Sequence, residues 1–265
     1  MNSYEIWATS PMSQIDKAEG LYAWRLILDV WQRMDRLNLN EKGCRLVDKV
    51  LQEDLGDCVR KSAYTLSASN SPSVPYLWKN YAGWDGFAIG LDTDYFWAPK
   101  YRLQQILALD KFDRRLPAAE GWRQILYNRD EQIACVERAL KWVANNWWRV
   151  GEVSGIYLPW ADFIDSARFI VQSLLLLMKE ESFSQESEVR FIAGTPPETP
   201  VTLTHGGKSY LPLAVIPKLI NDRTQPGLPV ANLVYGSQTE ANQVTSLAER
   251  IGIPPERVWE VELDE

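Results

Sequence analysis

Apolar side chains recur every three or four positions in several long segments, which is the spacing of helices that bury one face. In the first of these segments the apolar face consists of Leu21, Trp24, Leu28, Trp31 and Met34. Asn38 or Asn40 can cap the second segment, because an asparagine oxygen accepts hydrogen bonds from free helix N–H groups. We predict helices over residues 16–35, 40–60, 76–84, 130–150, 159–179 and 239–252.

Shorter runs between these helices alternate polar and apolar residues or are rich in β-branched and aromatic ones, as strands are. We predict strands over residues 62–69, 86–92, 101–109, 186–194, 209–216, 231–236 and 257–263. Strands and helices are interleaved, and several strands follow one another directly. This order predicts a single α+β domain over residues 1–265, with a mixed, mostly antiparallel sheet flanked by helices and a helical insert at roughly 110–180.

Composition narrows the class of protein. The chain has 265 residues, of which 46% are hydrophobic and 24% charged, as in ordinary globular proteins. The net charge of −7 argues against an extended nucleic-acid-binding surface, which would need a basic patch. The 12 tryptophans favour core packing over ligand stacking. The longest apolar run, Phe169–Met178, is too short to span a bilayer and predicts a buried helix, so no membrane contact is expected.

The cysteines and the histidine offer little chemistry. Cys44, Cys58 and Cys135 are odd in number and widely spaced, which fits neither a disulfide framework nor a zinc site. A reducing cytoplasm suits such cysteines, and no secretory signal is evident at the start of the chain. The single histidine, His205, lies in a segment that reads as a loop, so neither a Cys–His pair nor a Ser/His/Asp triad is expected.

The candidate chemistry lies in the segment "SFSQESEVRF", residues 182–191. In a strand, Glu186, Glu188 and Arg190 would share one face, and Val189 and Phe191 would pack inward on the other. Two carboxylates on one face repel each other unless a cation, a hydroxyl or a substrate lies between them, and Arg190 can serve as that cation. The charged face would then line a cleft; the alternative is an ordinary solvated sheet face.

Two serines have the same geometry on another strand. In "TLSAS", Ser67 and Ser69 point to one face, although ordinary strand serines would do the same. Asp92 and Asp94 lack the loop spacing of a calcium site, so we expect no metal, and no phosphate-binding loop is present. No cofactor is certain from the sequence, and NAD is considered below as a possible substrate.

Four blocks of the chain resemble a mainly bacterial family known as domain of unknown function 2971. The blocks are "IWATSPMSQIDKAE", "TLSASNSPSVPYLWKNYAGWDGFAIGLD", "SFSQESEVRF" and "LPVANLVYG". The matching positions are Trp7, Thr9, Asp16, Glu19, Ser67, Trp78, Tyr81, Gly86, Gly90, Phe183, Glu186, Glu188 and Arg190. Ile15 replaces a family Asn, and Ser237 replaces a family Pro. The usual Tyr-His-Tyr-Thr block of the family does not precede Trp7 in this chain.

The resemblance implies a fold and an activity. That missing block looks like the first strand of ADP-ribosyltransferase folds, in which a serine strand follows and a later strand carries a catalytic glutamate. By this analogy Glu188 would bind the nicotinamide ribose of NAD, and Glu186 would orient the acceptor. Ser67 and Ser69 would support the NAD pocket, and Trp78 or Tyr81 would stack on a ring. Arg25 is a candidate for the missing NAD-anchoring histidine.

Three functions follow as hypotheses. The first is an NAD-dependent ADP-ribosyltransferase or NAD glycohydrolase, acting as a toxin or phage-defence effector. The second is a non-catalytic binding or regulatory protein of the same fold, with a nucleotide or another protein as its partner. The third is an unrelated hydrolase, which would depend on a metal or a thiol. Arg149, beside Trp147 and Trp148, can also form an interface, although a helix end packed on the core is the favoured interpretation of these residues.

Overall fold

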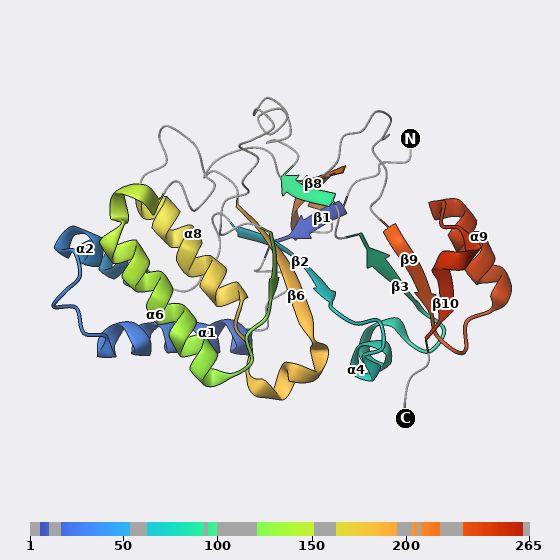
Figure 1. Ribbon diagram of the computed structural model, residues 1–265, viewed down its shortest axis with the longest axis horizontal. Coiled ribbons are helices and arrows are strands. Elements are labelled where there is room, and N and C mark those ends of the chain that lie inside the picture. The colour runs from blue at the N-terminus through green and yellow to red at the C-terminus, as the bar shows by residue number, and fades with distance from the viewer. Residues whose placement is uncertain are drawn as a thin grey trace.

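The computed structural model describes residues 6–10, 17–53, 63–92, 95–99, 121–150, 163–194, 203–205, 208–217 and 230–261. Figure 1 shows three parts side by side: a group of helices, a larger central sheet, and a smaller sheet covered by helix α9 (Ala241–Ile251). The predicted strand at 101–109, Cys58, Asp94 and Trp160 lie outside the described residues.

The central sheet has seven strands, and its neighbouring strands pair antiparallel throughout the described residues. Its order is β4-β8-β1-β2-β6-β5, with β7 paired to β8. The strands are β1 (Ile6–Thr9), β2 (Ala63–Ser69), β4 (Tyr95–Pro99), β5 (Gly121–Gln124), β6 (Glu188–Gly194), β7 (Leu203–His205) and β8 (Lys208–Pro217). None of the predicted strands covers β1, β4, β5 or β7. His205 is therefore the last residue of a strand, and its interpretation as a loop residue is wrong.

The smaller sheet is mixed. Strand β9 (Val230–Tyr235) pairs antiparallel with β3 (Phe87–Leu91) and parallel with β10 (Val258–Glu260). Helix α9 (Ala241–Ile251) packs on it through Ala248 against Leu233. The α+β class with flanking helices and mostly antiparallel strands is confirmed, but the strands form two sheets, and the described parallel pairing is confined to the smaller one.

Capping residues fix several helix ends as predicted. Asn40 caps α2 (Glu41–Leu51) by accepting hydrogen bonds from the backbone N–H groups of Lys42 and Gly43. The predicted extension of α2 to residue 60 is wrong, because the helix ends at Leu51. Gly83 follows the short helices α4 (Pro75–Leu77) and η2 (Trp78–Ala82), and Gly252 follows α9; both have positive φ, which glycine adopts without strain.

The four-helix group contains α1 (Lys17–Arg33), α2, α6 (Arg129–Asn145) and α8 (Phe163–Leu176). These helices share the largest buried apolar cluster in the described part of the chain. Helices α2 and α6 approach so closely that a Cβ atom on Gly43 would lie 1.8 Å from the carbonyl oxygen of Ala144. A short 3-10 helix, η4 (Trp147–Arg149), follows α6.

Helix α8 joins the helical group to the central sheet. Ile170 and Leu174 belong to the helical core, whereas Phe169 and Leu176 pack against Ile192 of β6. Most residues of α8 are buried, so the prediction of a buried helix is confirmed. None of the helices described is long and apolar enough to cross a membrane.

The described tryptophans divide between core and surface. Trp24, Trp31, Trp78 and Trp97 are buried, as the core interpretation predicts. Another set is partly exposed: Trp7, Trp84, Trp148 and Trp259. Trp147 meets Trp148 edge to face at the end of α6.

Candidate functional site

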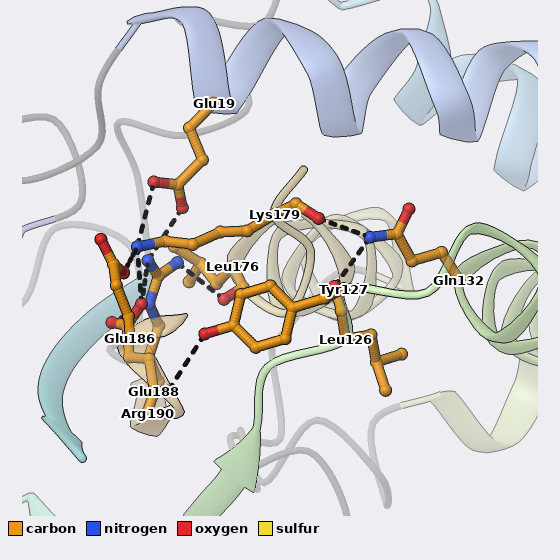
Figure 2. Close-up of polar contacts among 9 residues, drawn as sticks. All are labelled: Glu19, Leu126, Tyr127, Gln132, Leu176, Lys179, Glu186, Glu188 and Arg190. Atoms are coloured by element: carbon orange, nitrogen blue, oxygen red, sulfur yellow. Dashed lines mark hydrogen bonds and ion pairs between the residues drawn. The ribbon is translucent and has the colours of Figure 1, made fainter. Parts of the chain in front are cut away.

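Five charged side chains meet near the C-terminal end of α8 and the start of β6, and we call them the carboxylate cluster. Its members are Glu19, Lys179, Glu186, Glu188 and Arg190 (Figure 2). Glu19 comes from α1, Lys179 follows α8, and Glu188 and Arg190 open β6. Glu186 ends a 3-10 helix, η5 (Glu181–Glu186). Residues far apart in the sequence therefore build a single site.

Arg190 uses all three of its nitrogens. Its Nε and Nη2 donate to the two carboxylate oxygens of Glu188 at 2.7 and 3.0 Å. Nη2 also donates to Glu19 at 2.8 Å, and Nη1 donates to the carbonyl oxygen of Leu176 at 2.8 Å. Such a two-pronged arginine–carboxylate pair is strong and fixes the planes of both groups. The prediction that Arg190 holds a glutamate is confirmed for Glu188.

Lys179 holds the other glutamate. Its ammonium lies 2.5 Å from Glu186, 2.7 Å from Glu188 and 3.7 Å from Glu19 (Figure 2). The repulsion expected between Glu186 and Glu188 is thus offset by a lysine between them. Three carboxyl side chains therefore share two cationic ones.

The backbone around Ser187 explains how both glutamates reach Lys179. Ser187 has a φ of 46°, in the left-handed region, and it separates η5 from β6. Glu186 therefore does not lie in the strand, and its predicted place on the strand face beside Glu188 and Arg190 is wrong. The turn at Ser187 brings the two carboxylates together instead of a regular strand.

The cluster is also more buried than predicted. Glu186, Glu188 and Arg190 are 6%, 7% and 5% exposed, so this is not a solvated sheet face. The inward-facing role expected for Phe191 is confirmed, but Val189 is only partly buried. The reason is that α1 and α8 cover the charged side of β6 and exclude most water from it.

Burial and pairing act in opposite directions on the charges. Burial alone would raise the pKa of Glu188. The hydrogen bond and charge of Arg190, together with hydrogen bonds from Lys179 and Ser67, lower the pKa by more than burial raises it, so it lies below its usual value. Burial likewise lowers the pKa of Lys179, whereas its hydrogen bonds to Glu186 and Glu188 raise it above the usual range. The pKa of Arg190 is raised by Glu188 in the same way, against the effect of burial. Glu188, Lys179 and Arg190 are all ionised near neutral pH.

The lowered pKa of Glu188 predicts a loss of stability in acid. A folded-state pKa below the unfolded value gives stability that is fully present above the unfolded pKa and is lost as the pH falls through the folded pKa. Because an unfolded glutamate titrates near about pH 4.3, the urea midpoint should drop below that pH. The drop should be shallower in Glu188→Gln. If the urea midpoint falls equally steeply with pH in both proteins, Glu188 does not contribute to the loss of stability in acid.

Polar and aromatic residues border the cluster on its accessible side. Ser67 is exposed and hydrogen-bonds Glu188. The hydroxyl of Ser69 donates to the backbone oxygen of Glu186 at 3.3 Å. Tyr81 is 75% exposed, and its pKa is raised by burial of part of the ring and by the charge of Glu186. The ring of Phe183 lies 5.6 Å from the ammonium of Lys179.

The aromatic candidates differ in accessibility. Trp78 is 2% exposed, and its Nε1 donates to the carbonyl oxygen of Pro72 at 2.6 Å, so neither face of its ring is open to a ligand. Tyr81 is therefore the candidate that can stack on a ligand. Arg25 lies on the surface of α1 and makes no contact with the carboxylate cluster.

Besides Glu19, three residues of the site are not among the candidates found by sequence. Lys179 directly follows the apolar helix α8, and a lysine at the end of a buried helix is the only signal that could have pointed to it. The hydroxyl of Tyr127 accepts a hydrogen bond from the backbone N–H of Glu188 at 3.0 Å. Buried Gln132 donates to the carbonyl oxygens of Leu126 and Lys179, both at 2.7 Å (Figure 2).

The cluster is not arranged as a metal centre. No group of three or more His, Cys, Asp or Glu side chains suited to a metal ion occurs in the ranges described. Each of the three carboxylates instead has a lysine or an arginine as its partner. What the arrangement can do is present fixed, ionised carboxylates beside exposed hydroxyl and aromatic groups.

Comparison with known proteins gives one finding. Residues 77–191 match the model of a family described as Protein of unknown function (DUF2971). Tyr81, Lys179, Glu186, Glu188 and Arg190 lie inside the matched segment. No curated protein and no solved structure matches the chain. The family resemblance read from the sequence is thus confirmed, and over residues 77–191 this chain is a match to DUF2971.

Proposed function

We propose that the protein acts on NAD at the carboxylate cluster, as an ADP-ribosyltransferase or NAD glycohydrolase. The observation that carries the proposal is the pairing of two strands. The analogy requires a serine strand followed later by a glutamate strand, and β2 and β6 are direct neighbours in the sheet. Ser67 pairs with Arg190 and Ser69 with Glu188 in the register of β2 and β6.

The proposed chemistry centres on Glu188. Its carboxylate would accept a hydrogen bond from a hydroxyl of the nicotinamide ribose and offset the positive charge that develops on the sugar. The bond between ribose C1′ and the nicotinamide nitrogen breaks, and its electron pair leaves with nicotinamide. Water or an acceptor group then adds to C1′ and loses a proton. Glu186 would orient that nucleophile.

The contacts of Glu188 indicate how a substrate would reach it. The carboxylate already accepts hydrogen bonds from Arg190, Lys179 and Ser67. A carboxylate has about four acceptor positions, so these donors nearly fill them. Ser67 is the exposed member of the set, and its hydroxyl is the donor that a ribose hydroxyl would replace. Tyr81 would stack against a ring of the substrate.

An enzyme of this class consumes NAD or modifies a protein, which is the chemistry of a toxin or a phage-defence effector. That biological role is part of the same proposal and depends on turnover.

A second function is favoured by the saturation of the cluster. Both Glu188 and Glu186 are buried and ion-paired. In this second function the cluster has a purely structural role, which is to hold α1, α8 and β6 together. The protein would then be a non-catalytic binding or regulatory protein. It would bind a nucleotide or a protein partner without cleaving NAD.

The test is release of nicotinamide from NAD by purified protein, with labelled NAD and a cell lysate for transfer. We expect turnover by wild type and a loss of about 100-fold or more in Glu188→Gln, the size of losing one strong electrostatic contact to a transition state. Ser67→Ala should also lower the rate, with less effect on stability because Ser67 is exposed.

The matched control is Arg168→Gln. Arg168 is buried in α8 and pairs with Glu53 at 2.6 Å, away from the carboxylate cluster. This variant loses a comparable ion pair but should keep its NAD turnover once folded. If folded wild type releases no nicotinamide, the transferase and glycohydrolase proposal is wrong, and the binding function takes its place.

A further inference from the structure

A second candidate site lies on a different face of α1. A cavity of about 600 Å³ is lined by one side of α1, by the start of α6 and by Glu180. This volume is typical of sites for small molecules. Leu21 and Leu26 give it an apolar wall, and Tyr22 adds an aromatic one.

Cations dominate the polar lining of this cavity. Arg25 and Arg129 both line it and are exposed, and neither forms an ion pair with a carboxylate in the described part of the chain. Asp29 also lines it, but its carboxylate is held by Arg33 at 2.7 Å. Glu180 is then the remaining carboxylate opposite two uncompensated guanidinium groups. Two such groups on one cavity favour an anion, and arginine is particularly suited to phosphate.

Tyr22 and Arg129 are held in place before any ligand arrives. The guanidinium of Arg129 lies over the ring of Tyr22 at 5.6 Å from its centroid. The hydroxyl of Tyr22 donates to Oε1 of Gln132 at 2.7 Å, and Gln132 is fully buried. Ordering these side chains therefore costs little when a ligand binds.

We propose that this cavity is a nucleotide-binding site. The phosphates lie between Arg25 and Arg129, the base packs against Leu21 and the ring of Tyr22, and Glu180 accepts hydrogen bonds from the sugar hydroxyls. The site is distinct from the carboxylate cluster and does not depend on NAD chemistry there. It is nevertheless linked to the cluster, because Gln132 bonds both Tyr22 and the backbone of Lys179.

The probe is ADP, with adenosine as the ligand that lacks phosphate, and binding is measured by isothermal titration calorimetry. We expect wild type to bind ADP with a Kd below about 1 mM. Arg25→Gln and Arg129→Gln should each weaken ADP binding about tenfold or more, as loss of a charged hydrogen bond does. Adenosine should bind more weakly than ADP to wild type and should be insensitive to both changes.

Arg45→Gln is the matched control, because Arg45 is exposed, has its charge engaged by Glu41 at 3.3 Å and does not line the cavity. Its affinity for ADP should stay within about twofold of wild type. Absence of ADP binding, or equal affinities in wild type, Arg25→Gln and Arg129→Gln, would overturn the proposal. So would loss of ADP binding in folded Glu188→Gln alone, which would assign the nucleotide to the carboxylate cluster. Nicotinamide release is measured separately, so failure of either proposal is distinguishable from failure of the other.

Discussion

Replacing Lys179 with methionine should lower the free energy of unfolding by about 3–5 kcal/mol, the usual cost of removing one partner from a buried ion pair. Lys179 is the only cation paired with Glu186 in the described part of the chain, and it shares Glu188 with Arg190. Methionine has a similar length and fills the space, so the effect is one of charge more than of packing. Three carboxylates would then face Arg190 alone.

Urea unfolding at neutral pH measures this change, and Lys141→Met is its control. Lys141 forms an exposed ion pair with Glu137 on α6 at 3.2 Å, and a pair of that kind contributes about 0.5 kcal/mol or less. Adding Glu186→Gln to Lys179→Met should restore part of the loss, because the uncompensated buried carboxylate is then gone. A loss below about 1 kcal/mol in Lys179→Met would mean that the cluster is hydrated in solution.

Replacing Gln132 with leucine should lower the free energy of unfolding by about 2–4 kcal/mol, the second large effect that we expect. Gln132 is completely buried and makes three side-chain hydrogen bonds, to Tyr22, Leu126 and Lys179. Leucine has nearly the same volume but no polar atoms. The carbonyl oxygen of Lys179 would lose its donor and the hydroxyl of Tyr22 its acceptor, and each buried polar group left without a partner costs about 1–3 kcal/mol.

Thermal unfolding tests this prediction against Gln243→Leu, an exposed glutamine on α9 that should change stability by about 0.5 kcal/mol or less. The loss in Gln132→Leu should exceed that control clearly. If the two variants unfold at the same temperature, water must replace the lost hydrogen bonds, and the position of Lys179 would not depend on Gln132.

The parts of the fold that sequence predicted are those governed by local signals. Helices with an apolar face and a cap, such as α2 behind Asn40, follow from neighbouring residues alone. Strand β1 is only four residues long and pairs with β2 and β8, far away in the chain. Its stability comes from those neighbours, so no local pattern indicates it. The division into two sheets depends on the same kind of distant pairing.

The candidate site shows the same division. Alternation suggested that Glu188 and Arg190 lie on one face of a strand, and they do. Alternation also placed Glu186 there, but the left-handed turn at Ser187 breaks the pattern, and serine carries no strong signal for that conformation. Lys179 and Glu19 reach the site through the tertiary packing of α8 and α1. Such packing between distant segments cannot be predicted from the pattern of any single segment.

The distance along the chain between the partners of the carboxylate cluster has a consequence for folding kinetics. The bond from Arg190 to Glu19 joins residues 171 positions apart. Closing so long a loop is entropically costly, and it becomes favourable only after the helices and sheet between the two residues have begun to pack. We therefore expect the bond between Arg190 and Glu19 to form late in folding. It should slow unfolding more than it speeds folding.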